Sequence, residues 1–188
     1  DVDGVYTTDP NIENKAKKID KLAYEEMLEM SSTGSKVLQT RSVELAMKNN
    51  LILQVLSSFT NERGTFVVNE NELIEKEIVS GVSYSKNECK ITISGIPDKP
   101  GISAKIFGLM ASNNINVDMI VQNISQDGIS ANMTFTVSNK ELNNAKNIIE
   151  FNQKDLNYSN LTSDSDIAKI SVIGMGMMSQ SGVAEKMF

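Results

Sequence analysis

The sequence contains no histidine, no tryptophan and a single cysteine among its 188 residues. Without histidine, the chain has neither the commonest metal ligand nor the usual general base near neutral pH. A Ser-His or Cys-His catalytic pair is therefore excluded within it. The lone thiol, Cys89, cannot form an internal disulfide, which favours a reducing cytoplasm as the compartment.

Charge and hydropathy exclude two further classes of protein. The formal net charge is -6 and the acidic residues are spread along the chain, so no basic surface for nucleic acid is expected. No apolar run approaches the ~18 residues that a membrane-spanning helix needs. With 40% hydrophobic and 22% charged residues, the composition is that of a soluble globular protein of one or two domains.

Both ends of the sequence look like interruptions. Asp1 lies inside a turn-rich stretch that runs to Pro10, and Phe188 comes two turns into a helical pattern that has no stop signal. We therefore expect the chain to be an excerpt of a longer protein.

An internal repeat dominates the second half of the chain. Residues 90–95 align with 169–174, and residues 101–107 align with 182–188. The order strand, Gly, loop, Gly, helix recurs at a spacing of ~80 residues, which is the size of a domain rather than of a solenoid repeat. Duplication of one module, with the second copy truncated, explains the pattern.

The first copy can be followed element by element. We expect a strand at 90–95, a helix that starts at Ile102 and stops at Asn113-Asn114, and a strand at 115–121 with one apolar face. A returning strand at 132–137 follows, then a helix opened by a capping box at Ser138–Glu141, and a last strand near 156–161. This βαββαβ order is the ferredoxin-like arrangement.

The first 70 residues follow a different pattern. Helices are expected at 23–30 and 36–48, with Glu25, Glu26 and Glu29 forming a solvated helix face, and a buried strand is expected at 51–57. We therefore predict an α/β segment at 1–70, a ferredoxin-like α+β domain with its linker at 71–165, and the start of a second such domain at 166–188.

The loop from Asp98 to Gly101 is the strongest candidate for a binding site. It enters a helix whose first N–H groups lack internal partners and so favour an anion such as a carboxylate. The Asp98 carboxylate could accept from an ammonium group, and Gln122 on the adjacent strand could add a neutral hydrogen bond. These groups together suit a zwitterionic amino acid. The alternative is an ordinary capped helix start.

The stretch Asp1–Pro10 allows two interpretations. It is either a surface loop or part of a nucleotide site, in which Tyr6 stacks or hydrogen-bonds and Lys36 offers a cation for phosphate. Taken alone, Lys36 is better explained as a solvated lysine.

Several motifs together resemble one enzyme family. Those resembling the end of an aspartate kinase catalytic domain are Asp1–Pro10, Tyr24–Met30, Gly34–Leu38 and Arg41–Glu44. The segments 95–107 and 114–123 resemble the first regulatory ACT domain of the same enzymes, and 171–188 resembles the start of the second. The fold class implied is the α/β tail of an amino acid kinase domain followed by ferredoxin-like ACT domains.

The resemblance implies an enzyme that phosphorylates the β-carboxylate of L-aspartate with ATP and Mg²⁺. The nucleotide-side residues carried over are Asp1, Tyr6, Pro10, Lys36 and Val37. Asn11 stands where the family often has arginine. The phosphate-binding Lys-Phe-Gly-Gly motif and the aspartate-binding residues are not in this sequence. We therefore expect no catalytic residues and no metal site here, and no cofactor bound or kinase activity shown by the chain alone.

The same resemblance implies feedback control by threonine, lysine or both. The effector-binding residues carried over are Asp98, Pro100, Gly101, Ile102, Ala104 and Gln122. ACT domains pair side by side with the effector between them, so a homo-oligomer or a pair of regulatory and catalytic subunits is implied. The alternative is a separate amino-acid-sensing regulatory subunit without catalysis, which would not need the nucleotide-like segment Asp1–Leu38. Another amino acid kinase is disfavoured by the repeat.

Overall fold

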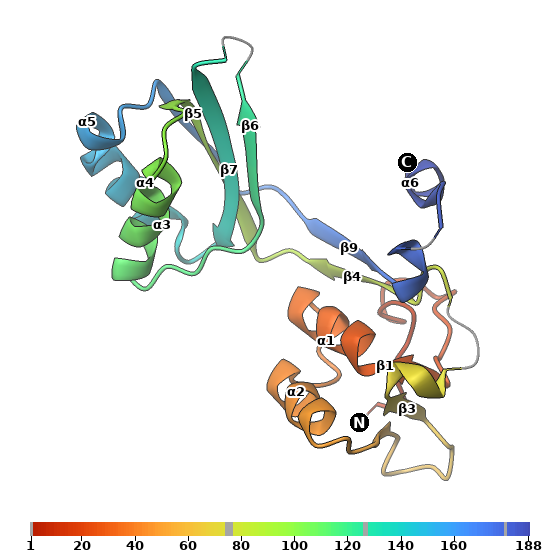
Figure 1. Cartoon of the computed structure of the whole chain (residues 1–188). Coiled ribbons are helices and arrows are strands. Elements are labelled where there is room, and N and C mark those ends of the chain that lie inside the picture. Colours follow the sequence, from red (N-terminus) through yellow and green to blue (C-terminus); the bar gives the residue numbers. More distant parts are fainter. Residues whose placement is uncertain (1, 74–76, 126–127, 179) are drawn as a thin grey trace. The chain divides into compact units, whose positions relative to one another are not determined.

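The computed structural model describes residues 2–73, 77–125, 128–178 and 180–188, and it divides into two compact units (Figure 1). Unit 1 comprises Asp1–Ser85 and Ile170–Phe188, and unit 2 comprises Lys86–Lys169. The chain thus leaves unit 1, builds unit 2 and returns to unit 1. The boundaries at 70 and 165 drawn from the sequence stay predictions.

Unit 1 is built on a three-stranded sheet with two helices. The sheet has the order β1-β3-β2, with β1 parallel and β2 antiparallel to β3. Its elements are β1 (Lys21–Ala23), α1 (Tyr24–Thr33), α2 (Thr40–Lys48), β2 (Leu53–Val55), β3 (Thr65–Val68) and the 3₁₀ turn η1 (Glu70–Glu72). Helix α1 buries Tyr24, Met27 and Met30, whose three-residue spacing places them on one face.

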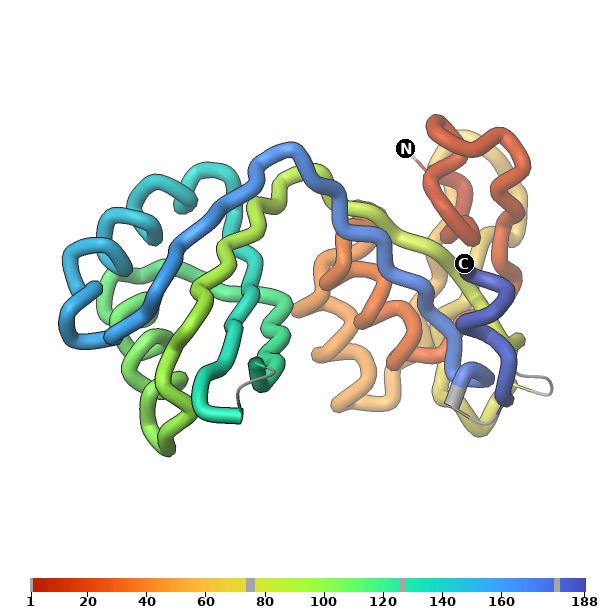
Figure 2. Tube along the Cα trace, turned by 90° about the horizontal axis from the view of Figure 1, so that it is seen from above, coloured from red at the N-terminus to blue at the C-terminus, as the bar shows by residue number. Residues whose placement is uncertain are grey.

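The end of the chain completes unit 1. Strand β9 (Lys169–Ile173) pairs with β4 (Gly81–Ser85), and the two strands run side by side in Figure 2. Ile173 joins the same buried cluster as Val5 and Met27. The 3₁₀ turn η2 (Met175–Met178) and helix α6 (Val183–Met187) follow.

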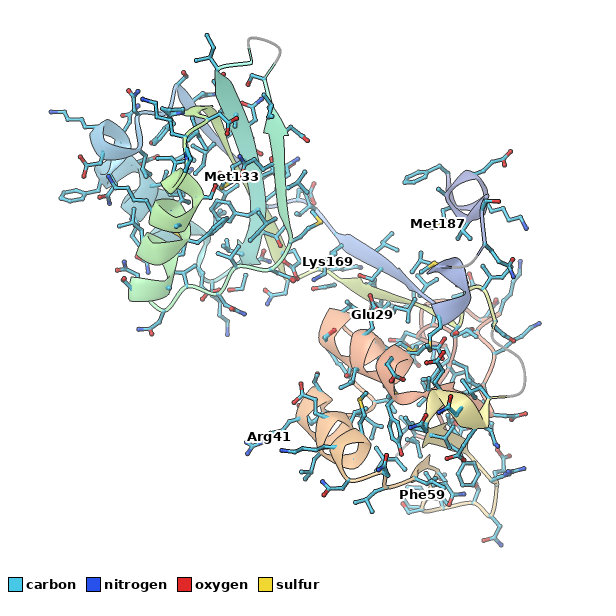
Figure 3. The ribbon with its side chains drawn as sticks, viewed as in Figure 1. Glu29, Arg41, Phe59, Met133, Lys169 and Met187 are labelled. Carbon is cyan, nitrogen blue, oxygen red and sulfur yellow. The ribbon has the colours of Figure 1, made fainter. Side chains whose placement is uncertain are left out.

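Unit 2 has the predicted βαββαβ order. Its elements are β5 (Glu88–Pro97), α3 (Ile102–Ser112), β6 (Ile120–Ile124), β7 (Ser130–Ser138), α4 (Leu142–Phe151), α5 (Gln153–Leu156) and β8 (Asn160–Asp164). The antiparallel sheet has the order β6-β7-β5-β8, and the helices cover one of its faces (Figure 1). Met133, labelled in Figure 3, is 1% exposed and belongs to the core between sheet and helices. The ferredoxin-like prediction is confirmed.

The backbone confirms the internal repeat. Gly101 and Gly182 each precede a helix in the left-handed conformation, with φ of 93° and 85°. Only glycine adopts this conformation without steric cost. The second copy therefore reproduces the strand, glycine and helix of the first, although its strand pairs with β4 and not with another ferredoxin-like strand.

Two predictions for unit 1 were wrong at their boundaries. The second helix starts at Thr40 and not at Lys36, because Val37 and Leu38 turn inward to pack against the core. The segment 51–57 is not a buried strand: only 53–55 pair, and the flanking Leu51 is 57% exposed.

Three predictions for unit 2 also need correction. The second strand spans 120–124 and not 115–121, and the last strand starts at Asn160, after a short helix. No capping box opens α4. The Glu141 carboxylate instead accepts from the Ser138 hydroxyl at 2.6 Å and from the Asn116 N–H at 3.2 Å, and so ties the helix start to the loop before β6.

Within the described part of the chain, no helix combines the length and the apolar character needed to cross a membrane.

The Glu141 contacts predict a pH-dependent stability. The Ser138 hydroxyl first, and then the Asn116 N–H, lower the pKa of Glu141 below its ordinary value. Because the folded-state pKa is lowered, this stabilisation is complete above the unfolded-state pKa and is lost as pH falls through the folded one. Glu141→Gln should therefore reduce the free energy of unfolding near neutral pH by about 1 kcal/mol, and the difference should shrink in acid. Urea unfolding of the whole chain at both pH values measures it.

Glu150→Gln is the matched control, because Glu150 is an exposed carboxylate on the same helix. A Glu141→Gln deficit that is equally large in acid and at neutral pH would contradict the role of the ionised carboxylate.

Candidate functional site

The predicted nucleotide-side residue Tyr6 lies on a short two-stranded loop in unit 1. The Thr7 N–H donates to the Lys17 carbonyl and the Ile19 N–H to the Val5 carbonyl, each at 2.9 Å. The buried Thr65 hydroxyl accepts from the Val5 N–H at 2.8 Å. Backbone pairing and a buried side chain thus fix the position of Tyr6.

A polar cluster surrounds the Tyr6 hydroxyl. It donates to Asp3 Oδ2 at 3.0 Å, and Lys18 Nζ lies 3.3 Å from the same oxygen and 2.5 Å from Glu62 Oε2. The bond from Tyr6 is the main cause that lowers the pKa of Asp3, and it raises the pKa of Tyr6. The bond to Glu62 is the main cause that raises the pKa of Lys18. Tyr6 is therefore a neutral phenol held beside a carboxylate and an ammonium.

The turn after this loop is closed by its own side chains. Asn11 donates to Asp9 Oδ1 from its backbone N–H at 2.9 Å and from its side-chain Nδ2 at 3.0 Å. Pro10 lies exposed within the turn. Asn11 therefore stabilises the turn, and it does not provide the cation that an arginine would.

Lys36 and Val37 lie in the loop between α1 and α2 and not at a helix start. The Lys36 side chain is exposed, whereas Val37 is half-buried against the core of unit 1. The loop begins at Gly34, where α1 ends with a φ of 132°. Lys36 is thus free to meet a ligand, while Val37 anchors the loop.

Strand β4 contacts both of these segments. The Val82 N–H donates to the Thr7 carbonyl at 2.7 Å, next to Tyr6. At Gly34, a Cβ atom would lie 2.4 Å from the Tyr84 carbonyl oxygen, so glycine is required for this close approach. The loop of Tyr6 and the loop of Lys36, which are remote in sequence, are therefore held against the same strand. Asp1, the remaining nucleotide-side residue, lies outside the described residues.

The candidate effector loop lies at one end of the sheet of unit 2. The Asp98 N–H donates to the Ile129 carbonyl at 3.1 Å, which fixes the loop to the residue just before β7. Gly101 turns the chain into α3, and the space around its missing Cβ is open. Asp98, Pro100, Gly101 and Ala104 are exposed, whereas Ile102 is half-buried against the core. The loop thus presents a carboxylate and a helix N-terminus to its surroundings.

Ser103 links this loop to Gln122, a contact that the sequence did not predict. Gln122 pairs with the core residue Met133 in the β6–β7 register, so its side chain lies on the helix-covered face of the sheet. There the Ser103 hydroxyl donates to Gln122 Oε1 at 3.2 Å. The only sequence signal was a serine in the first turn of the helix.

Strand β6 is an edge strand, and all five of its residues are exposed. The neighbouring apolar side chains Met119, Ile120, Val121, Ile124 and Ile129 are between 41% and 77% exposed. An open edge with apolar side chains is a template for pairing with another strand. The candidate effector residues therefore lie beside a surface that can accept a partner.

Among the described residues, no three or more His, Cys, Asp or Glu side chains are grouped so that they could hold a metal ion.

Two family models match separate parts of the chain. Residues 1–57 match the amino acid kinase family, and residues 89–152 match the ACT domain. The first range contains the Tyr6 and Lys36 segments, and the second contains the Asp98 loop and Gln122.

Aspartate kinases match the chain along its whole length. It is 48% identical to an aspartate kinase of Pseudomonas fluorescens, over 100% of this chain and 46% of that protein. The chain therefore spans about half the length of the curated relatives it matches.

Solved structures agree with these relatives. The regulatory subunit of aspartate kinase from Thermus thermophilus is 35% identical, with a TM-score of 0.56 over 60% of this chain and 73% of that one. Escherichia coli aspartokinase III, solved with lysine and aspartate, is 26% identical, with a TM-score of 0.71 over 93% of this chain and 38% of that one. With an amino acid kinase segment and an ACT domain joined in one polypeptide, this chain belongs to the aspartate kinase family.

Proposed function

We propose that the chain is part of an aspartate kinase that transfers a phosphoryl group from ATP, with Mg²⁺, to the β-carboxylate of L-aspartate. This reaction is the first step in the biosynthesis of lysine, threonine and methionine. The protein would carry it out in the cytoplasm. The observation that supports the proposal is 48% identity to an aspartate kinase along the whole chain, through both the kinase segment and the ACT domain.

In this proposal the Tyr6 and Lys36 loops form one side of the nucleotide site. ATP supplies the phosphoryl group, and this chain supplies binding groups. The Tyr6 ring, held in place by its bond to Asp3, would pack against the base or ribose. The exposed Lys36 would meet the phosphates, with Val37 anchoring its loop and Pro10 bordering the site. Asp1, which lies outside the described residues, is assigned to this site by the family resemblance alone. Without the Lys-Phe-Gly-Gly motif, the chain alone is expected to be inactive.

The Asp98 loop is proposed to bind threonine, lysine or both as feedback inhibitor. The start of α3 would receive the carboxylate of the amino acid, because helix N-termini favour anions. Asp98 would receive its ammonium group, and Gln122, oriented by Ser103, would contact the side chain. The E. coli enzyme solved with lysine supports an amino acid as the class of ligand.

The exposed edge of β6 is proposed to pair with a second ACT domain. The apolar residues along this edge would be buried, and the amino acid at the Asp98 loop would be enclosed. Pairing would produce either a homo-oligomer or an assembly of regulatory and catalytic subunits.

One observation favours a second candidate, a separate amino-acid-sensing subunit. The chain covers 73% of the Thermus thermophilus regulatory subunit. The match of residues 1–57 to the amino acid kinase family favours the kinase. Aspartate-dependent formation of ADP by the complete protein decides between the two.

The first functional prediction concerns Lys36. In the complete protein, Lys36→Met should raise the KM for ATP about tenfold, because a charge-assisted contact to phosphate is worth at least 1.4 kcal/mol. A coupled assay of ADP release at varied ATP measures it. Lys48→Met is the control, since Lys48 is also exposed and lies at the end of α2. Equal KM values in the two variants would remove Lys36 from the site.

The second functional prediction concerns Asp98. Asp98→Asn should weaken binding of threonine or lysine by about ten- to a hundredfold, because the ammonium loses its charged partner. Calorimetric titration of both amino acids into wild type and variant identifies the effector. Asp166→Asn, which changes another exposed carboxylate of unit 2, should bind as wild type does. Unaltered affinity in Asp98→Asn would place the effector elsewhere.

A further inference from the structure

Glu26 is a carboxylate buried at the start of α1, where the sequence predicted a solvated face. It is 6% exposed. Its Oε2 accepts from the Ala23 N–H at 3.2 Å, and its Oε1 accepts from the Ser80 hydroxyl and from the Met175 N–H, the latter at 3.2 Å. A buried charge is costly unless hydrogen bonds satisfy it. The three hydrogen bonds therefore compensate for the burial of the Glu26 carboxylate, and they also fix the positions of the three donor residues.

The three donors come from three separate parts of unit 1. Ala23 precedes α1, Ser80 lies on the segment that leads into β4, and Met175 lies just after β9. We call Glu26 together with segments 77–80 and 173–176 the Glu26 junction. One carboxylate thus bonds the residue just before β4, the strand that leads to the ACT domain, and a residue just after β9, the strand that returns from it.

The two segments of the Glu26 junction are packed backbone against backbone. The Ser80 N–H donates to the Ile173 carbonyl at 2.8 Å, and the Gly176 N–H to the Glu77 carbonyl at 3.3 Å. A Cβ atom on Gly174 would lie 2.2 Å from the Ile78 carbonyl oxygen. Neither segment can move alone without breaking these contacts.

The junction continues directly into the contacts that hold the nucleotide-side loops. Strand β4 begins at Gly81, immediately after Ser80, and a Cβ atom there would lie 2.8 Å from Met30 Cε of α1. One residue later, the Val82 N–H bonds the Thr7 carbonyl at 2.7 Å. Further along, Tyr84 abuts Gly34 at the start of the Lys36 loop. The position of β4 thus sets the backbone at both loops.

From this series of contacts we infer that Glu26 is a positioning residue for the nucleotide-side loops. By fixing the start of β4 against α1, it holds Thr7 and, through it, the neighbouring Tyr6. The chain enters and leaves the ACT domain through β4 and β9, so the same junction transmits effector binding to nucleotide affinity. This role rests on the proposed function for the identity of the ligands.

Glu26→Gln in the complete protein tests the inference. The variant keeps the volume of the side chain, but its amide nitrogen faces at least one of the three donors. Amide hydrogen exchange at Val82 and within residues 5–8 should become about tenfold faster, and the KM for ATP should rise about tenfold, because a hydrogen bond to a charged group is lost. The turnover number should change by less than about twofold, and the effector should raise the KM for ATP less than in wild type.

The control and a second variant separate positioning from folding. Glu25→Gln alters the exposed neighbouring carboxylate and should leave exchange and KM at wild-type values. Gly174→Ala forces the junction apart from its other side without any change in charge, and should reproduce the effects of Glu26→Gln. If Glu26→Gln does not fold, the hydrogen exchange and the KM for ATP of Gly174→Ala test the inference instead. A merely structural Glu26 would lower the melting temperature and the active fraction, with unaltered KM and unaltered exchange at 5–8, and that result overturns the inference.

Because the hydrogen-exchange measurement does not depend on turnover, a failure of the positioning role can be distinguished from a failure of the proposed function. A wild-type protein that forms no ADP with aspartate defeats the proposed function. Unaltered exchange at 5–8 in both junction variants defeats the positioning role.

Discussion

The buried Glu26 carboxylate connects three separate parts of unit 1. Because the Glu26 carboxylate lies away from water, its oxygens need hydrogen-bond donors from the protein. These donors are the Ala23 N–H, the Ser80 hydroxyl and the Met175 N–H. This requirement draws the last part of the chain back onto the first. It also explains why Gly174 and Gly176 face the backbone of 77–79, where side chains would separate the two segments. The return of the chain after the ACT domain is thus specified by polar satisfaction as much as by the burial of Ile173.

Unit 2 obeys a different constraint, that of an unpaired sheet edge. Strands β5 and β7 contribute to the buried core and β8 packs the partly buried Leu161 against it, whereas β6 has exposed side chains throughout. Soluble proteins usually protect such an edge with charges or proline. Here the edge carries Ile120, Val121 and Ile124 instead. The neighbouring Ser103–Gln122 bond fixes the start of α3 to this edge, so a ligand on the Asp98 loop and a partner on β6 would meet at one place.

The structure could be predicted from the sequence wherever the signal was local. The βαββαβ order followed from periodicity, and the turn before α3 followed from Pro100 and Gly101, since φ > 0 favours glycine. The sequence was insufficient wherever the structure at one residue depends on a partner from another element of the fold. Glu26 lies on a helix that looks solvated, because its partners Ser80 and Met175 cannot be seen from α1. Lys36 and Val37 have helical surroundings, yet packing of Val37 against the core keeps them in a loop. The role of Ser103, which lies on helix α3, was missed because its partner Gln122 lies on strand β6.

A feedback inhibitor can shift an enzyme only by as much as its affinity differs between two arrangements. Closely packed backbone contacts can separate two such arrangements, because these contacts are either formed or broken and do not deform continuously. The Glu26 junction has this character: a carboxylate with three donors on one side and glycine-to-backbone contacts on the other. The two loops that contact β4 gain or lose their support together. Under the proposed function, control of nucleotide affinity would therefore need no contact between effector and nucleotide, only a second arrangement of β4 and β9.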